Sequence, residues 1–152
     1  MKNFEIEEGD LLDKLSLAVS ALPGASVQER ICEQRSGGRY SPDGLLDVRL
    51  NRHRFELVIE AKRELFPRDV RQQIWQLRDY LDRMDGSGEK VPMLIAAAIS
   101  KGARDILQQE GVGYFDPSGS LFVPSSGAYV LIDRPPPKKA DRALASIFQG
   151  QR

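Results

Sequence analysis

The chain has 152 residues, of which 41% are hydrophobic and 29% are charged, and its net charge is zero. These values predict one globular domain of ordinary composition and argue against a strongly basic protein that coats nucleic acid. No apolar run approaches the roughly 18 residues that a membrane helix needs, and the first residues lack the apolar core of a signal peptide. We therefore expect a cytoplasmic protein without a membrane partner.

Charge is unevenly spread along this neutral chain. Residues 49–78 hold eight basic and four acidic residues. Such a basic middle fits contact with phosphate groups, although a solvated mixed surface is the plainer explanation of charge alone. Cys32 is the single cysteine, which excludes a disulfide and a cysteine zinc site within one chain.

The first part of the chain is predicted to form a helix and a strand. Apolar residues recur at helical spacing over 6–21, and Pro23-Gly24 ends the helix. Residues 26–34 predict a strand with a weaker pattern. The buried side of the helix is expected to consist of Leu11, Leu12, Leu15, Leu17, Ala18 and Leu22.

Two segments with alternating apolar residues, 44–50 and 55–62, predict a β-hairpin around a turn at 51–54. Because side chains alternate along a strand, the second segment has two distinct faces. One face is expected to carry Phe55, Leu57, Ile59 and Ala61, and the other Glu56, Val58, Glu60 and Lys62.

The second half of the chain is predicted to alternate helices and strands. Pro67 opens a helix to about Met84, whose core stripe is Val70, Ile74, Leu77, Leu81 and Met84. The near-continuous apolar run from Val91 to Ile99 is typical of a strand covered on both faces. A short helix at 101–110 and short strands at 114–115, 121–123 and 129–132 are expected to follow.

This order predicts an α/β fold in which helices flank a mixed β-sheet. We expect one domain over residues 1–133. Residues 134–152 are expected to form a linker and tail, which open with a proline run and lead toward the start of a further helix or C-terminal module.

An acid and a lysine end the apolar strand of the hairpin, as Glu60-Ala61-Lys62. Glu60 and Lys62 share a face, because residues two apart in a strand point the same way. A turn centred between 52 and 53 would set Lys62 opposite Asp43 and make Asp43 and Asp47 diagonal neighbours of Glu60. Either aspartate could then share a metal with Glu60. We favour Asp43, because it lies beside Lys62 at the end of the strand, where a substrate could enter.

Pro42-Asp43 followed by Glu60-Ala61-Lys62 resembles the PD-(D/E)xK nuclease superfamily, with its restriction-endonuclease-like core of helix, three strands, helix and strand. The resemblance implies a nuclease that cleaves DNA phosphodiesters. Its metal, Mg²⁺ or Mn²⁺, would be held by Asp43 and Glu60, with Asp47 as the alternative first ligand. Lys62 would be the catalytic lysine. Hard oxygen ligands of this kind suit Mg²⁺.

The following helix adds a second likeness. Gln76 and Tyr80 resemble the Gln-x-x-x-Tyr motif of the exonuclease-like branch of that superfamily. This implies a catalytic role for Gln76 and contact with nucleic acid for Gln73, Tyr80 and Arg63. Gln73, Gln76 and Tyr80 form one flank beside the core stripe, and ordinary boundary residues would produce the same pattern.

Residues 111–119 resemble a segment of bacterial abortive-infection antitoxin-type regulators, which join a nuclease-like domain to a winged helix. Ser120 stands where that segment usually has asparagine. The likeness implies an alternative function, a catalytically inert nuclease-fold module that binds DNA or regulates transcription. Both functions stay open, as does a homodimeric assembly.

Two further residues have competing interpretations. His53, the single histidine, is expected to be a surface residue of the turn rather than a catalytic base, which would need partners within reach. Trp75, between Arg71 and Arg78, either packs over the sheet edge or stacks on a base, and we favour packing.

Overall fold

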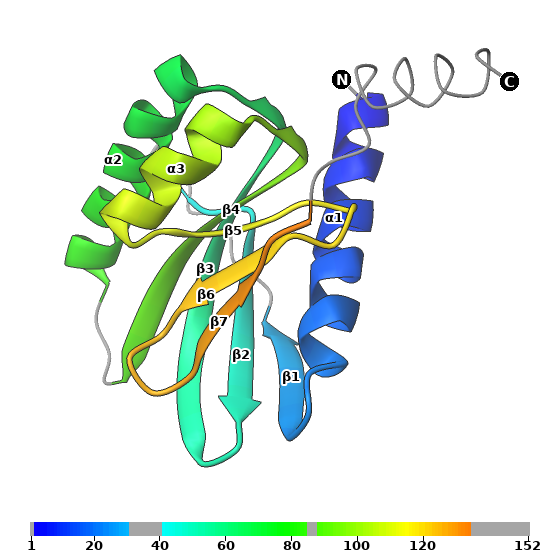
Figure 1. Ribbon diagram of the computed structural model, residues 1–152, viewed down its shortest axis with the longest axis vertical. Helices are drawn as coiled ribbons and strands as arrows, with labels where there is room; N and C mark the ends of the chain where they lie inside the picture. The colour runs from blue at the N-terminus through cyan, green and yellow to red at the C-terminus, as the bar shows by residue number, and fades with distance from the viewer. Residues whose placement is uncertain (1, 31–40, 85–87, 135–152) are drawn as a thin grey trace, which may run out of the picture.

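The computed structural model describes residues 2–30, 41–84 and 88–134 of the chain (Figure 1). Within them lie three helices and seven strands, which confirm the α/β class. Cys32, the end of the 26–34 strand prediction, the proline linker and the predicted C-terminal helix lie outside the described residues. Among the described residues, no helix combines the length and apolar character that crossing a membrane requires.

Seven strands form one mixed sheet in which the spatial order equals the chain order. They are β1 (Ala25–Arg30), β2 (Gly44–Leu50), β3 (His53–Leu65), β4 (Glu89–Ile99), β5 (Gly113–Phe115), β6 (Leu121–Pro124) and β7 (Tyr129–Ile132). Neighbours pair antiparallel except β3 with β4 and β4 with β5, which are parallel. Each parallel pair is joined by a helix, because a parallel connection must carry the chain back along the sheet.

Helices cover the sheet on both faces (Figure 1). Helix α1 (Lys2–Ser20) packs on one face, whereas α2 (Pro67–Arg83) and α3 (Lys101–Glu110) lie side by side on the other. The α1 face of β3 and β4 carries Phe55, Leu57, Ile59, Ala61, Val91, Met93 and Ile95, and the α2 face carries Val58, Leu94 and Ala96. Both predicted faces of β3 and the double coverage of β4 are thereby confirmed.

The predicted buried side of helix α1 is confirmed except at one residue, since Leu12, Ala18 and Leu22 also pack against the core. Leu11, Leu15 and Val19 are buried at a spacing of four residues, whereas Leu17 is 71% exposed. The prediction that Leu17 is part of the core is wrong. Residues two apart on a helix point to different sides, so a helix that touches the sheet along one line cannot bury Leu15 and Leu17 together.

The β2–β3 hairpin turns earlier than its sequence indicates. Leu50 pairs with His53, so the turn is only Asn51-Arg52, and Asn51 adopts the left-handed backbone with φ 58°. Such two-residue turns match the twist of the strands, and asparagine tolerates the left-handed region. The predicted register is therefore off by two residues along β3. An even shift leaves every side chain on its predicted face.

Helix α2 follows its predicted core stripe closely. Val70, Ile74 and Leu77 are buried, and Leu81 and Met84 pack against the same cluster while partly exposed. A proline at its first turn is compatible with the helix, because the first backbone N–H groups of a helix have no partner within it. The helix ends at Arg83 in the structure.

The segment after α3 is held by a buried guanidinium. Arg104 donates to Asp133 at 2.8 Å and lies 3.4 Å from Asp116, and the side chains of Arg104 and Asp116 are both almost fully buried. Asp116 also accepts the N–H of Ser118 and closes the turn, while Ser120 binds both backbone groups of Arg134. In this structure the 111–120 motif therefore joins α3, β6 and the end of β7.

Leu15 and Leu17 provide a matched test of how α1 packs. We expect Leu15→Ala to lower the free energy of unfolding by about 2–5 kcal/mol, because Leu15 is fully buried against the sheet. The exposed Leu17→Ala is expected to change it by less than about 0.5 kcal/mol. Urea denaturation monitored by circular dichroism measures both, and equal effects would contradict this orientation of α1.

Candidate functional site

Asp43 makes hydrogen bonds to the two residues of β3 that flank Glu60. Its backbone N–H donates to the carbonyl of Ile59 at 2.8 Å. Its carboxylate oxygen Oδ2 accepts the N–H of Ala61, also at 2.8 Å. These two contacts set Asp43 beside Glu60, one rung beyond the last regular pair of the hairpin, Gly44 with Ile59.

Glu60 and Lys62 form an ion pair on the α2 face of β3. Glu60 Oε2 lies 3.2 Å from Lys62 Nζ, and the Glu60 side chain is only 9% exposed, against 35% for Lys62. A carboxylate this deeply buried needs compensating partners. Lys62 is one such partner, and it lies on the more exposed side of the cluster.

The carboxyl groups of Asp43 and Glu60 lie close enough to affect each other's ionisation. Burial of its carboxyl group raises the pKa of Asp43, and this outweighs the Ala61 N–H, the charge of Lys62 and a hydrogen bond with Glu60, which all lower it. Asp43 is exposed as a residue, but its carboxyl end faces β3. Two carboxyl groups this close do not readily ionise together, so they favour a shared proton or a cation.

Asp47 lies away from this cluster, on the same face of β2. It pairs across the hairpin with Glu56, whereas Leu45 and Val58 occupy the rung between it and the cluster. Its carboxylate is 3.6 Å from the guanidinium of Arg54. The structure therefore brings Asp43, not Asp47, to Glu60 and Lys62.

Arg63 and the α2 residues differ in their relation to the cluster. Arg63 is exposed, and strand alternation directs it to the face opposite Lys62. Gln73, Gln76 and Tyr80 lie on one flank of α2, opposite the flank where Arg78 binds Glu110 of α3. That flank therefore looks away from α3.

The rise per residue gives the approximate position of this flank along β3. Helix α2 runs back along β3, since it joins two parallel strands. With rises of about 1.5 Å per helix residue and about 3.3 Å per strand residue, Gln73 is level with about Lys62, and Gln76 with about Glu60. The Gln73 side-chain oxygen is buried and has no hydrogen-bond partner within the described part of the chain.

Hard oxygen donors make the cluster suitable for a small divalent cation. Asp43 and Glu60 supply two adjoining carboxyl groups, and Mg²⁺ commonly binds through one or two carboxylates while keeping several waters. Over residues 2–30, 41–84 and 88–134, no group of three or more histidine, cysteine, aspartate or glutamate side chains is arranged to hold a metal. The fit therefore rests on two carboxylates and not on a closed protein cage.

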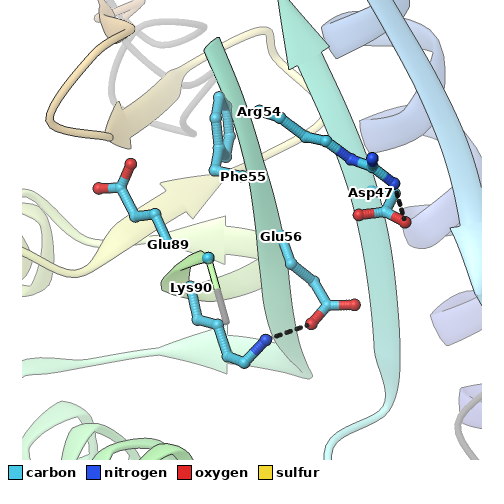
Figure 2. A pocket seen from close by; sticks show the side chains of 7 residues that line it. Asp47, Arg54, Phe55, Glu56, Glu89 and Lys90 are labelled. Atoms are coloured by element: carbon cyan, nitrogen blue, oxygen red, sulfur yellow. Dashed lines mark hydrogen bonds and ion pairs between the residues drawn. The ribbon is translucent and has the colours of Figure 1, made fainter. Parts of the chain in front are cut away.

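A cavity lies elsewhere, near the start of β3 (Figure 2). Its volume is about 400 Å³, and its lining residues are Asp47, Arg54, Phe55, Glu56, Gly88, Glu89 and Lys90. Figure 2 shows two pairs among the charged groups, Glu56 with Lys90 and Asp47 with Arg54, at 3.1 Å and 3.6 Å. The fifth charged group, Glu89, contacts His53 instead. The Asp43–Glu60–Lys62 cluster differs in that two carboxyl groups gather around a single lysine.

His53 takes part in a hydrogen-bonded junction of three strand ends. Its Nε2 lies 2.7 Å from Oε1 of Glu89, which also accepts the hydroxyl of Ser125. The other oxygen of Glu89 accepts the N–H of Ser126. Gly127 lies so close to the imidazole that a Cβ there would overlap the ring. His53 is thus half-buried and structural, more enclosed than the surface residue we expected.

Sequence reasoning missed the Glu56–Lys90 and His53–Glu89 contacts. Glu56 and Lys90 face each other across the parallel β3–β4 pair, in a register that no turn between them fixes. The sequence signal for the Glu56–Lys90 contact is one charged residue on the buried face of each strand, and it is recognisable only once the register of β3 and β4 is known.

No protein-family model matches this chain, and a search of curated proteins found no related sequence. What the site does must therefore be argued from its own geometry.

Glu89 gives stability a specific dependence on pH. Burial alone would raise its pKa, but hydrogen bonds from His53, the Ser126 N–H and the two serine hydroxyls lower it to about 2, from 4.5. A lowered pKa means that ionised Glu89 stabilises the fold fully above pH 4.5, and that this stabilisation is lost as the pH falls toward 2. Denaturant unfolding of wild type and Glu89→Gln should differ most above that range and converge below it. A difference that grows on acidification would contradict this role.

Proposed function

We propose that the chain is a divalent-metal-dependent nuclease domain that hydrolyses DNA phosphodiesters with Asp43, Glu60 and Lys62. The observation that carries the proposal is the contact of these three side chains on one sheet face, two of them from β3 and one from the segment leading into β2. The restriction-endonuclease-like fold is part of the same proposal. It is supported by the order of helix, three strands, helix and strand over α1 to β4.

Asp43 and Glu60 would hold the metal, Mg²⁺ or Mn²⁺. When bound, the metal would polarise the phosphate and lower the pKa of a water, which makes that water a nucleophile near neutral pH. The two carboxylates fix its position, because Asp43 is anchored by its contacts with Ile59 and Ala61.

Lys62 would balance the charge that develops on the phosphate. Its Nζ lies at the more exposed end of the cluster, where a phosphate can approach it. During hydrolysis a water oxygen bonds to phosphorus and the bond from phosphorus to the sugar oxygen breaks. A fixed positive group near the phosphate oxygens stabilises the added negative charge of that transition state.

Gln73 and Gln76 would act from the flank of α2 that is level with the cluster. The buried side-chain oxygen of Gln73 is a hydrogen-bond acceptor without a partner in the described residues, so it suits an ordered water or an amino group of the substrate. Tyr80 lies toward the C-terminal end of α2 and packs against the same apolar cluster as Leu45. We propose that these three side chains line the path of the nucleic acid.

Metal binding distinguishes the two aspartates that the sequence left open. At about 100 times its dissociation constant, Mn²⁺ is expected to stabilise the wild type by about 2.7 kcal/mol. Asp43→Asn should lose this stabilisation, and Asp47→Asn, the matched control on the same strand face, should retain it. Thermal unfolding with Mn²⁺ and with a chelator measures the effect. If only Asp47→Asn lost the stabilisation by Mn²⁺, Asp47 rather than Asp43 would hold the metal, and the proposed site would be wrong.

Cleavage tests the catalytic step. We expect wild type to nick plasmid DNA with Mg²⁺ or Mn²⁺, and we expect Glu60→Gln and Lys62→Met each to lower the rate roughly 100-fold or more. Glu64→Gln, an exposed acid further along β3, is the control and should cut normally. Wild type that cuts no DNA with either metal would overturn the enzymatic proposal.

A catalytically inert module is the second candidate, because the three side chains already satisfy one another: Lys62 pairs with Glu60, and Asp43 binds the Ala61 N–H. This candidate expects DNA binding in a chelator, with an affinity that falls as salt rises. Fluorescence anisotropy of labelled duplexes measures that binding. Binding without cleavage supports the inert module, whereas cleavage with metal excludes it.

A further inference from the structure

Trp75 stands on the outer side of α2 with its indole in solvent. It is the only tryptophan of the chain and is 66% exposed. The expectation that Trp75 packs over the sheet edge is therefore wrong. Its neighbours one turn away, Arg71 and Arg78, lie on the same side of the helix. Exposed tryptophan and arginine together are the residues most enriched at the energetic centres of protein interfaces.

A hollow adjoins this indole in the groove between α2 and α3. Its volume is about 210 Å³, and it is lined by Arg71, Ile74, Trp75, Arg78 and Glu110. Ile74 is 4% exposed and gives the hollow an apolar floor. The surface thus combines a projecting apolar ring with an adjacent recess.

The rim of the hollow carries both signs of charge. Arg78 is fixed by Glu110, whose carboxylate it binds at 2.9 Å and whose backbone carbonyl it also contacts. Arg71 is exposed and makes no ion pair or hydrogen bond within the part of the chain that the structure describes. Arg71 therefore lies on the same rim as the carboxylate of Glu110, which Arg78 binds and which is still 38% exposed.

We propose that this face, defined by Arg71, Trp75 and Glu110, is where two copies of the chain meet. A two-fold axis places the same patch against itself, so the patch must be self-complementary. Here the Trp75 ring of each copy enters the hollow of the other, and Arg71 of each copy meets Glu110 of the other.

The charge balance of α2 favours a second copy over nucleic acid. A surface that follows a phosphate backbone needs clustered cations without partners. On the outer side of α2, Arg83 pairs with Asp79 at 3.1 Å, and Arg78 pairs with Glu110. The patch also lies on the flank of α2 opposite Gln73 and Gln76, so pairing leaves the Asp43–Glu60–Lys62 cluster uncovered.

The sole tryptophan makes the association directly measurable. We expect the emission maximum to shift to the blue, and acrylamide quenching to fall, as the wild-type concentration rises from micromolar to millimolar. Sedimentation equilibrium over the same range should show a monomer–dimer equilibrium. Trp75→Ala should stay monomeric by sedimentation, while Tyr129→Ala, which removes a ring that is equally exposed at 66%, should dimerise normally.

A charge swap tests the geometry of the pairing. Arg71→Glu and Glu110→Arg should each weaken the homodimer at least tenfold, because each sets like charges against each other across the two-fold axis. An equimolar mixture of the two variants should recover the affinity, since both contacts then regain opposite charges. Circular dichroism checks that each variant is folded.

Three results would overturn the proposal. One is a wild type that remains monomeric at every concentration. Another is a dimer that survives Trp75→Ala, and a third is a mixture of charge variants that fails to associate. A tryptophan signal that responds to single-stranded DNA at constant protein concentration, without any dependence on protein concentration, would identify the face as a nucleic-acid surface instead.

Discussion

Strand β3 is covered on both faces, and the rest of the structure depends on this burial. Its residues from Phe55 to Ala61 are all buried, between α1 on one side and α2 on the other. A strand in this position must have partners at both edges, because buried backbone groups need hydrogen bonds. Strands β2 and β4 supply them, and the parallel pairing with β4 requires α2 to run back across the face that carries Glu60.

Burial also explains where the charged groups of β3 find partners. Glu56 and Glu60 both project toward the α2 face, where an uncompensated carboxylate would be costly. Glu56 meets Lys90 directly across the parallel pair and is neutralised near the start of the strand. Glu60 meets Lys62 and Asp43 instead, so one cation faces two carboxyl groups. The proposed divalent cation would offset this excess of negative charge near Glu60.

Helix α2 presents two different flanks to its surroundings. Gln73, Gln76 and Tyr80 lie on the flank away from α3, and the side-chain oxygen of Gln73 is buried there. The opposite flank meets α3 through Arg78 and Glu110 and leaves Trp75 exposed beside it. One helix can thus serve a substrate path and an interface between copies, because the buried stripe of Val70, Ile74 and Leu77 separates the two surfaces.

The sequence by itself determined the elements, the faces of β3 and the shared face of Glu60 and Lys62, because these follow from local periodicity. Tertiary structure decided the rest. A two-residue turn at Asn51 moved the hairpin register and set Asp43 rather than Asp47 beside Glu60. Contact with the sheet along one line left Leu17 in solvent, and the position of α3 left Trp75 there. Distances between segments far apart in the chain depend on turns and packing, which local patterns do not encode.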